Sequence, residues 1–171
     1  MTQYCPSCAS PVCSPYGHSD TLLIVGEFPG DEEMLQGRPF ASNRRFMTAG
    51  RVFKEEMNLE GMALNEFRVT NLWLHKPNDK ENCWQAGYNH VLEEAKGKQA
   101  ILLVGSDVVS TFTNYKVSDV SGLQVDSAIL SAPIIMAMVN PASAMVIGHG
   151  LGEVRFAVQK WKSILEKEGL L

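Results

Sequence analysis

The feature that most constrains the fold is a short apolar run at residues 22–25, which stops at Gly26 and opens into a polar loop. Valine, isoleucine and leucine in an unbroken run favour a strand that is buried on both faces. The loop that follows contains Glu27, Pro29 and Gly30, with further carboxylates after them. Because open α/β sheets place their sites at the carboxyl ends of such strands, we expect this loop to carry part of a functional site.

Strand-like and helix-like segments alternate along the rest of the chain. Strands are expected at 21–25, 67–73, 100–104 and 133–139, helices at 43–57, 84–95, 108–112 and 154–168, and a mixed segment with room for a short hairpin at 117–132. This alternation predicts an α/β fold, a three-layer α/β/α arrangement with a mostly parallel central sheet. The 171 residues contain no repeat or linker, so we expect one domain whose residues 1–20 form a Cys-rich metal-binding segment.

Composition narrows the partners and the location. The net charge of −4 argues against a broadly basic nucleic-acid-binding surface, although Arg44 and Arg45 belong to a local cluster of arginines that can contact DNA. No run approaches the ~18 apolar residues of a membrane-spanning helix. The start of the chain also lacks the basic and apolar regions of a secretory signal. We expect a cytoplasmic monomer with no membrane partner.

Two stretches of the first loop carry a family resemblance: Gly26-Glu27-Phe28-Pro29-Gly30 and Gln36-Gly37-Arg38-Pro39-Phe40. They resemble the first motif of the uracil-DNA glycosylase superfamily, most closely that of its iron–sulfur branch. The resemblance runs from about Cys5 to the last predicted helix and is weaker after Gly105. It implies the fold of that superfamily and hydrolysis of the N-glycosidic bond of uracil or a related base in single- or double-stranded DNA.

The carboxylates of this loop are the first catalytic candidates. A glycosylase needs a carboxylate that positions or deprotonates a water, or that stabilises the cationic sugar formed as the base leaves. The resemblance implies that Glu27 and Glu33 do this work. The alternative is that the acidic residues 31–33 only solubilise the loop or favour the start of a helix.

The resemblance also implies a base-binding pocket. Phe40 is the candidate to stack on an extruded base, since Pro39 fixes the backbone before it. Asn71 can donate and accept hydrogen bonds along the edge of uracil, and the loop from Gly26 to Gly30 forms the opposite side. The alternatives are a core phenylalanine and an asparagine that satisfies its own turn.

Two positions depart from the iron–sulfur branch. Asn140, in Asn140-Pro141-Ala142-Ser143, stands where that branch normally has histidine, and it resembles the second motif of the mismatch-specific uracil/thymine branch. The alternative is a simple turn after a strand. Phe28 stands where the family usually has a small residue, so its ring could narrow or block the pocket. Three functions stay open: a slow uracil glycosylase, a glycosylase for another modified base, and a catalytically silent relative that binds DNA or nucleotides.

The residues after Pro141 are candidates for DNA contact. Ser143 and Met145 lie where this superfamily places a loop that wedges into DNA, and an apolar side chain can fill the hole left by a flipped base. The alternative is that this segment starts a helix and packs inward.

Four cysteines form the last constellation: Cys5, Cys8 and Cys13 near the start of the chain, and Cys83. Thiolates at such spacing bind zinc or an iron–sulfur cluster, and without a secretory signal disulfides are disfavoured. The resemblance implies a 4Fe-4S cluster. A site made of the four cysteines is preferred over one in which His75 replaces Cys13, and zinc and unligated cysteines stay open.

Overall fold

The computed structural model describes residues 5, 12–42, 47–145 and 150–171. Four strands form a parallel sheet in the order β2-β1-β3-β4. They are β1 (Leu22–Gly26), β2 (Arg68–Asn71), β3 (Ala100–Val104) and β4 (Ile134–Met138). The expected α/β fold with a parallel sheet is confirmed.

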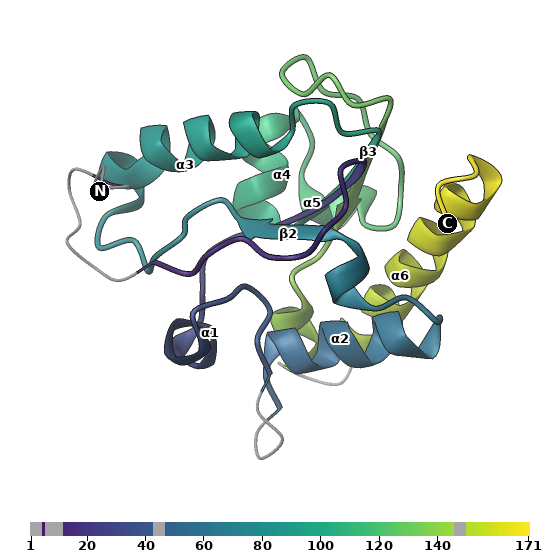
Figure 1. Cartoon of the computed structure of the whole chain (residues 1–171), viewed down its shortest axis with the longest axis horizontal. Helices are drawn as coiled ribbons and strands as arrows, with labels where there is room; N and C mark the ends of the chain where they lie inside the picture. Colours follow the sequence, from purple (N-terminus) through teal and green to yellow (C-terminus); the bar gives the residue numbers. More distant parts are fainter. Residues whose placement is uncertain (1–4, 6–11, 43–46, 146–149) are drawn as a thin grey trace.

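Helices cover both faces of the sheet (Figure 1). One face packs against α2 (Ala49–Leu59) and α6 (Gly150–Lys167). The other packs against α3 (Lys80–Glu94), α4 (Ser106–Phe112) and α5 (Val117–Val120). The remaining elements are α1 (Asp31–Gln36) and the 3-10 helices η1 (Leu64–Glu66) and η2 (Pro141–Met145). None of the described helices is both long and apolar enough to cross a membrane.

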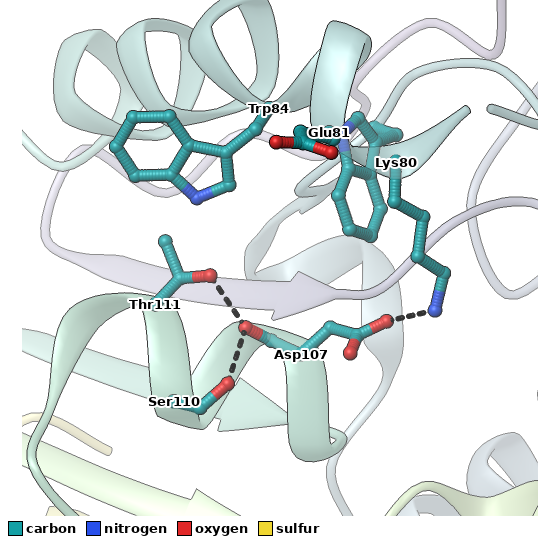
Figure 2. Close-up of a pocket in the computed structure, with 7 residues that line it drawn as sticks. Lys80, Glu81, Trp84, Asp107, Ser110 and Thr111 are labelled. Atoms are coloured by element: carbon teal, nitrogen blue, oxygen red, sulfur yellow. Dashed lines mark hydrogen bonds and ion pairs between the residues drawn. The ribbon is translucent and has the colours of Figure 1, made fainter.

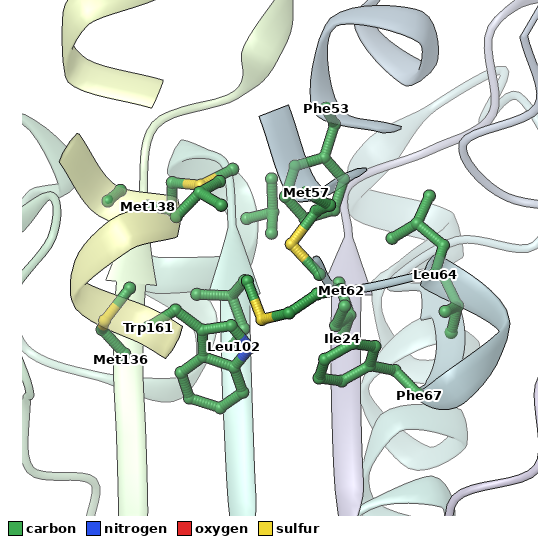
Figure 3. Packing of buried hydrophobic residues seen from close by; sticks show 14 of the residues in the cluster. Ile24, Phe53, Met57, Met62, Leu64, Phe67, Leu102, Met136, Met138 and Trp161 are labelled. Carbon is green, nitrogen blue, oxygen red and sulfur yellow. The ribbon is translucent and has the colours of Figure 1, made fainter. Parts of the chain in front are cut away.

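The strands divide their side chains between two cores. On β1, Ile24 joins the core beneath α2 and α6, and its neighbour Val25 joins the core beneath α3 and α4. This alternation follows from the two-residue period of a strand. Figure 3 shows the first core, where Phe53 and Trp161 pack over the strands. Complete burial of such side chains stabilises the fold by about 1.5–3 kcal/mol each.

The structure corrects three of the expected elements. Residues 31–36, expected as loop, form α1, because three acidic residues occupy its first turn and Gly37 ends it with a positive φ of 69°. The expected hairpin in 117–132 is absent from this described segment, where α5 forms and Gln124 bridges antiparallel to Met136 of β4. The helix expected at 43–57 is described from Ala49, after its N-cap Thr48.

The strand order creates a crevice at the carboxyl end of the sheet. The chain runs from β1 to β2 on one side and then returns to β3 on the other side of β1. Loops that leave β1 and β3 therefore separate in opposite directions, which is where open α/β sheets bind ligands.

Candidate active site

A cavity of about 180 Å³ lies at the carboxyl ends of the strands. Seven of the residues predicted from the sequence line it together, with Ala49, Val104 and Ala142 between them: Glu27, Phe28, Gly30, Glu33, Phe40, Asn71 and Asn140. Its size is below the ~300–1,000 Å³ of pockets for drug-sized ligands and suits a small ring.

Glu27, directly after β1, is held by donors from two other strand ends. Its Oε1 accepts from the backbone N–H of Asp107 at 2.8 Å and from Ser106 Oγ at 3.2 Å, and its Oε2 accepts from Asn140 Nδ2 at 2.7 Å. Gly105 makes this approach possible, because a Cβ there would lie 2.4 Å from Glu27 Cδ. The carboxylate is therefore fixed at the centre of the crevice.

Glu33 connects two walls of the cavity. One oxygen accepts from the Gly30 backbone N–H at 2.8 Å, and the other accepts from the Phe40 backbone N–H. Burial raises the pKa of Glu33, against the opposing effect of these backbone donors and of the nearby Asn71 amide. The helix-start alternative is also correct for residues 31–33, since they form the first turn of α1. Glu33 thus lies in the first turn of α1 and also lines the cavity.

Asn71 ends β2 and is only 1% exposed. Its Nδ2 is buried and makes no hydrogen bond of normal geometry within the described part of the chain. Gly26 lies against it, because a Cβ at Gly26 would come 2.4 Å from Asn71 Oδ1 and 2.8 Å from Phe40 Cζ. Glycine at this position lets the amide and the aromatic ring meet at the base of the cavity.

Phe40 is both a core residue and a wall of the cavity. Its ring is 4.9 Å from the ring of Phe53, centroid to centroid, and its backbone has a φ of 50°. A left-handed conformation costs a residue other than glycine about 1–2 kcal/mol. Gly50 of α2 packs against this segment, since a Cβ there would lie 2.6 Å from the carbonyl of Phe40. The strained turn is held by α2 on one side and by Glu33 on the other.

Asn140 forms a turn and also reaches the cavity. Its Oδ1 accepts from the Ala142 backbone N–H at 2.9 Å, while its Nδ2 donates to Glu27. Ser143 Oγ donates to the Asn140 carbonyl at 2.6 Å. Met145 ends η2 with 44% of its surface exposed, so it does not pack inward as the alternative expected. Arg44 and Arg45 lie outside the described residues.

A second group of polar side chains lies apart from this cavity. The ligand atoms of Cys5, His75 and Cys83 all lie within 4.8 Å of one another, and all three residues are buried. The two Sγ atoms are 3.6 Å apart. Two thiols and an imidazole are suitable ligands for zinc or for an iron–sulfur cluster. Cys8, a predicted ligand, lies outside the described residues.

Cys13, which the sequence analysis preferred over His75, does not belong to this group. Its Sγ donates to the Glu33 carbonyl at 3.1 Å and lies 3.7 Å from Met34 Sδ. Burial raises the pKa of this thiol to about 11, which disfavours the thiolate that a metal needs. Among the described residues, it is His75 and not Cys13 that lies beside Cys5 and Cys83.

Sequence reasoning missed the part that Gly105, Ser106 and Asp107 play at the site. The sequence analysis assigned none of these three residues to the site. Their position directly after a buried strand was the available signal, because parallel strands end at the same edge of a sheet as Glu27.

A comparison with known protein families finds a match over most of the chain. The model of the family described as the uracil DNA glycosylase superfamily matches residues 15–162, a span that contains every residue lining the cavity. A comparison with curated proteins finds no match.

Proposed function

Because the chain belongs to the uracil DNA glycosylase superfamily, we propose that it hydrolyses the N-glycosidic bond of uracil or a related base in DNA. Asn71 carries the proposal. A poorly satisfied buried donor costs about 1–3 kcal/mol. Asn71 Nδ2 is such a donor at a ring-sized cavity, because it lies near the Glu33 carboxylate but makes no hydrogen bond of normal geometry in the described structure. A carbonyl of a pyrimidine base supplies a well-placed acceptor, and Asn71 Oδ1 can accept from the adjacent ring N–H.

Glu27 is suited to place the attacking water. A carboxylate has about four acceptor positions, of which Ser106, Asp107 and Asn140 occupy three. The remaining position can hold a water beside the sugar. As the bond between the sugar carbon and the base nitrogen breaks, its electron pair leaves with the base. The water oxygen then bonds to that carbon, and its proton passes to Glu27. The same negative charge stabilises the cationic sugar.

The other residues of the cavity orient the base. The Phe40 ring offers a flat face on which an extruded base can stack, and Glu33 fixes this ring relative to the Gly30 turn through its two backbone hydrogen bonds. The second N–H of Asn140 Nδ2 remains available to the departing base, since the first is used by Glu27.

A specific observation favours a second candidate, a silent relative that binds DNA or nucleotides without turnover. Among the described residues that line the cavity none is cationic. Asn140 offers a neutral donor where a protonated side chain would stabilise a departing anionic base more strongly. Phe28 also occupies part of the wall. A slow enzyme and a silent binder therefore both agree with this lining.

Incubation with uracil-containing oligonucleotides, single- and double-stranded, followed by alkaline cleavage at abasic sites, tests the function directly. We expect cleavage only where uracil stood. Glu27→Gln should reduce it by about 10²-fold or more, and Asn71→Ala and Phe40→Ala should weaken uracil binding. Asn89→Ala, an exposed asparagine on α3, is the matched control and should behave as the wild type. Unchanged binding and turnover in both cavity variants would exclude this pocket.

We propose further that Cys5, His75 and Cys83 hold a metal centre, with Cys8 as the fourth ligand. Two candidates remain for it. The family resemblance favours a 4Fe-4S cluster. The 3.6 Å between Cys5 Sγ and Cys83 Sγ favours a single zinc ion, because bonds of 2.3 Å in a tetrahedral site place two sulfurs about 3.8 Å apart. Either group would join the start of the chain to the segment after β2, which holds His75, and to the first turn of α3, which holds Cys83.

A further inference from the structure

A second and larger cavity, of about 540 Å³, lies between the beginnings of α3 and α4 (Figure 2). No step proposed above uses it. Its lining combines two indole rings with charged and hydroxyl groups: Trp73, Lys80, Glu81, Trp84, Asp107 and the pair Ser110 and Thr111.

The two cavities share a wall. Asp107 lines the larger cavity with its side chain, and its backbone N–H donates to Glu27 in the smaller one. Phe28 lines the smaller cavity, and its ring centroid is 6.4 Å from that of Trp73. Lys80 Nζ lies 5.3 Å from the same Phe28 centroid. The two cavities are therefore adjacent at the carboxyl end of the sheet.

Trp84 gives the larger cavity a stacking surface. Its side chain is 40% exposed, and it is stacked on Tyr88 at 4.7 Å, while Tyr88 is stacked on Phe112 at 5.6 Å. Figure 2 shows the Trp84 ring across the cavity from Thr111 and Asp107 of α4, with the edge that carries its nitrogen toward them. The ring is thus supported from behind and presents area to a planar ligand, and stacking on an aromatic side chain is a main source of affinity for unpaired bases.

The charged side chains that line this cavity favour a neutral ligand over a phosphate. Lys80 is paired with the Asp107 carboxylate, and its Nζ also lies 5.6 Å from the Trp73 centroid. Glu81 adds a second carboxylate, so negative charge is in excess and a phosphate is a poor occupant. A neutral heteroaromatic ring with an exocyclic amino group can stack on Trp84 and donate to a carboxylate.

We propose that this cavity binds an unpaired adenine, cytosine or guanine next to the target base, on the same strand. The inference rests on the proposed function, since it takes the smaller cavity as the site of the target base. It implies that the protein binds single-stranded DNA better than duplex DNA, because a neighbour that is paired cannot enter the cavity.

Fluorescence anisotropy with labelled single-stranded oligonucleotides tests this inference. Each oligonucleotide carries one 2′-fluoro-deoxyuridine, which resists hydrolysis, among adenines, and each flanking adenine is replaced in turn by an abasic residue. We expect one flanking position at which the replacement weakens binding by about tenfold or more. Thymine there should also bind more weakly than adenine, because it has no amino group.

Variants of the lining residues then test whether the base at that flanking position occupies the cavity. Trp84→Ala should weaken binding of the intact oligonucleotide about as much, and the abasic replacement should then cost nothing further. Thr111→Met fills the cavity while Trp84 itself is retained, and it should have the same effect. Tyr115→Ala, at a tyrosine that is 41% exposed and outside the lining, is the matched control and should bind normally.

Two results would overturn the inference. One is a binding affinity that no flanking abasic replacement changes. The other is a loss of affinity for Trp84→Ala with the abasic oligonucleotide that equals the sum of the two separate losses. Failure of the proposed function looks different. If the smaller cavity does not bind the target base, replacing the fluorouridine by an abasic residue changes nothing, and if it binds without turnover, no abasic product forms from uracil. In both cases the coupling between Trp84 and the flanking base can still be measured.

Discussion

Glu33 is the residue whose ionisation the fold perturbs most clearly at the site. Burial raises its folded-state pKa above the unfolded value. The folded protein therefore binds this proton more tightly, so the contribution of Glu33 to stability is complete below the unfolded pKa and is lost as the pH rises through the folded pKa. The ionised group still accepts from Gly30 and Phe40, which limits the size of the loss.

Glu33→Gln should remove this pH dependence. We expect thermal unfolding of the variant to vary less with pH than that of the wild type across the range from the ordinary glutamate pKa to about pH 7. The acidic limb of any base-release profile should also shift in the variant, because the wild-type carboxylate forms only above its raised pKa. Identical profiles for the two proteins would show that Glu33 does not titrate in this range.

Asn140 is the residue that limits the rate if the enzyme is slow. Asn140→His should raise uracil release by up to about 10²-fold, since a protonated imidazole can stabilise the departing base and still donate to Glu27. The gain should grow as the pH falls toward the ordinary histidine pKa of about 6.5. Alkaline cleavage of abasic product measures it.

Asn140→Ala is the control and should show no gain, because it offers no donor. Phe28→Gly added to Asn140→His should increase release further if the ring crowds the base. If wild type, single variant and double variant all give no product, the silent binder is the better description. Strong wild-type activity that disappears in Asn140→His would instead assign Asn140 to another base or mechanism.

At the scale of elements, the contact between α2 and the Phe40 turn decides the shape of the cavity. Gly50→Ala should destabilise the protein by about 1–3 kcal/mol and weaken ligand binding. Its Cβ would lie 2.6 Å from backbone atoms of Phe40 and Ala41, so α2 must move. Chemical denaturation measures the change in the free energy of unfolding.

Gly152→Ala in α6 is the matched control for this contact. Nothing lies within 4 Å of a Cβ at Gly152. Alanine there should stabilise the helix by up to about 1 kcal/mol through helix propensity alone. Equal effects of the two substitutions would mean that α2 is not fixed against the turn.

At the scale of the whole molecule, the proposed metal centre would join segments that are far apart in the sequence. Cys83→Ala should abolish bound metal and lower the melting temperature, because removal of a buried ligand frees the start of the chain. Cys13→Ala should retain the metal, since Cys13 contacts Glu33 and Met34 instead. Elemental analysis of anaerobic preparations separates iron with sulfide from zinc.

Two results of the elemental analysis would contradict these expectations. Loss of metal in Cys13→Ala with retention in His75→Ala would return Cys13 to the ligand set. A wild-type protein without iron or zinc would remove the metal centre altogether.

The sequence by itself determined the parallel α/β architecture and most of the cavity. Short unbroken apolar runs favour strands buried on both faces, and helices between them favour parallel pairing. Glu27, Asn71 and Asn140 were expected at strand ends. Because parallel strands end at one edge of the sheet, the structure brings these three residues together in the lining of one cavity. Their places near strand ends follow from the predicted strands, whereas their roles were implied by the family resemblance.

Only the tertiary structure decided which groups meet across long separations. The proximity of His75, rather than Cys13, to Cys5 depends on how the segment after β2 folds back on Cys5, and sequence spacing carries no information about that contact. The bonds from Asp107 and Asn140 to Glu27 likewise join strand ends that are far apart in the chain. Such contacts are fixed by the packing of whole elements, because a side chain can reach a distant partner only after the sheet order has been set.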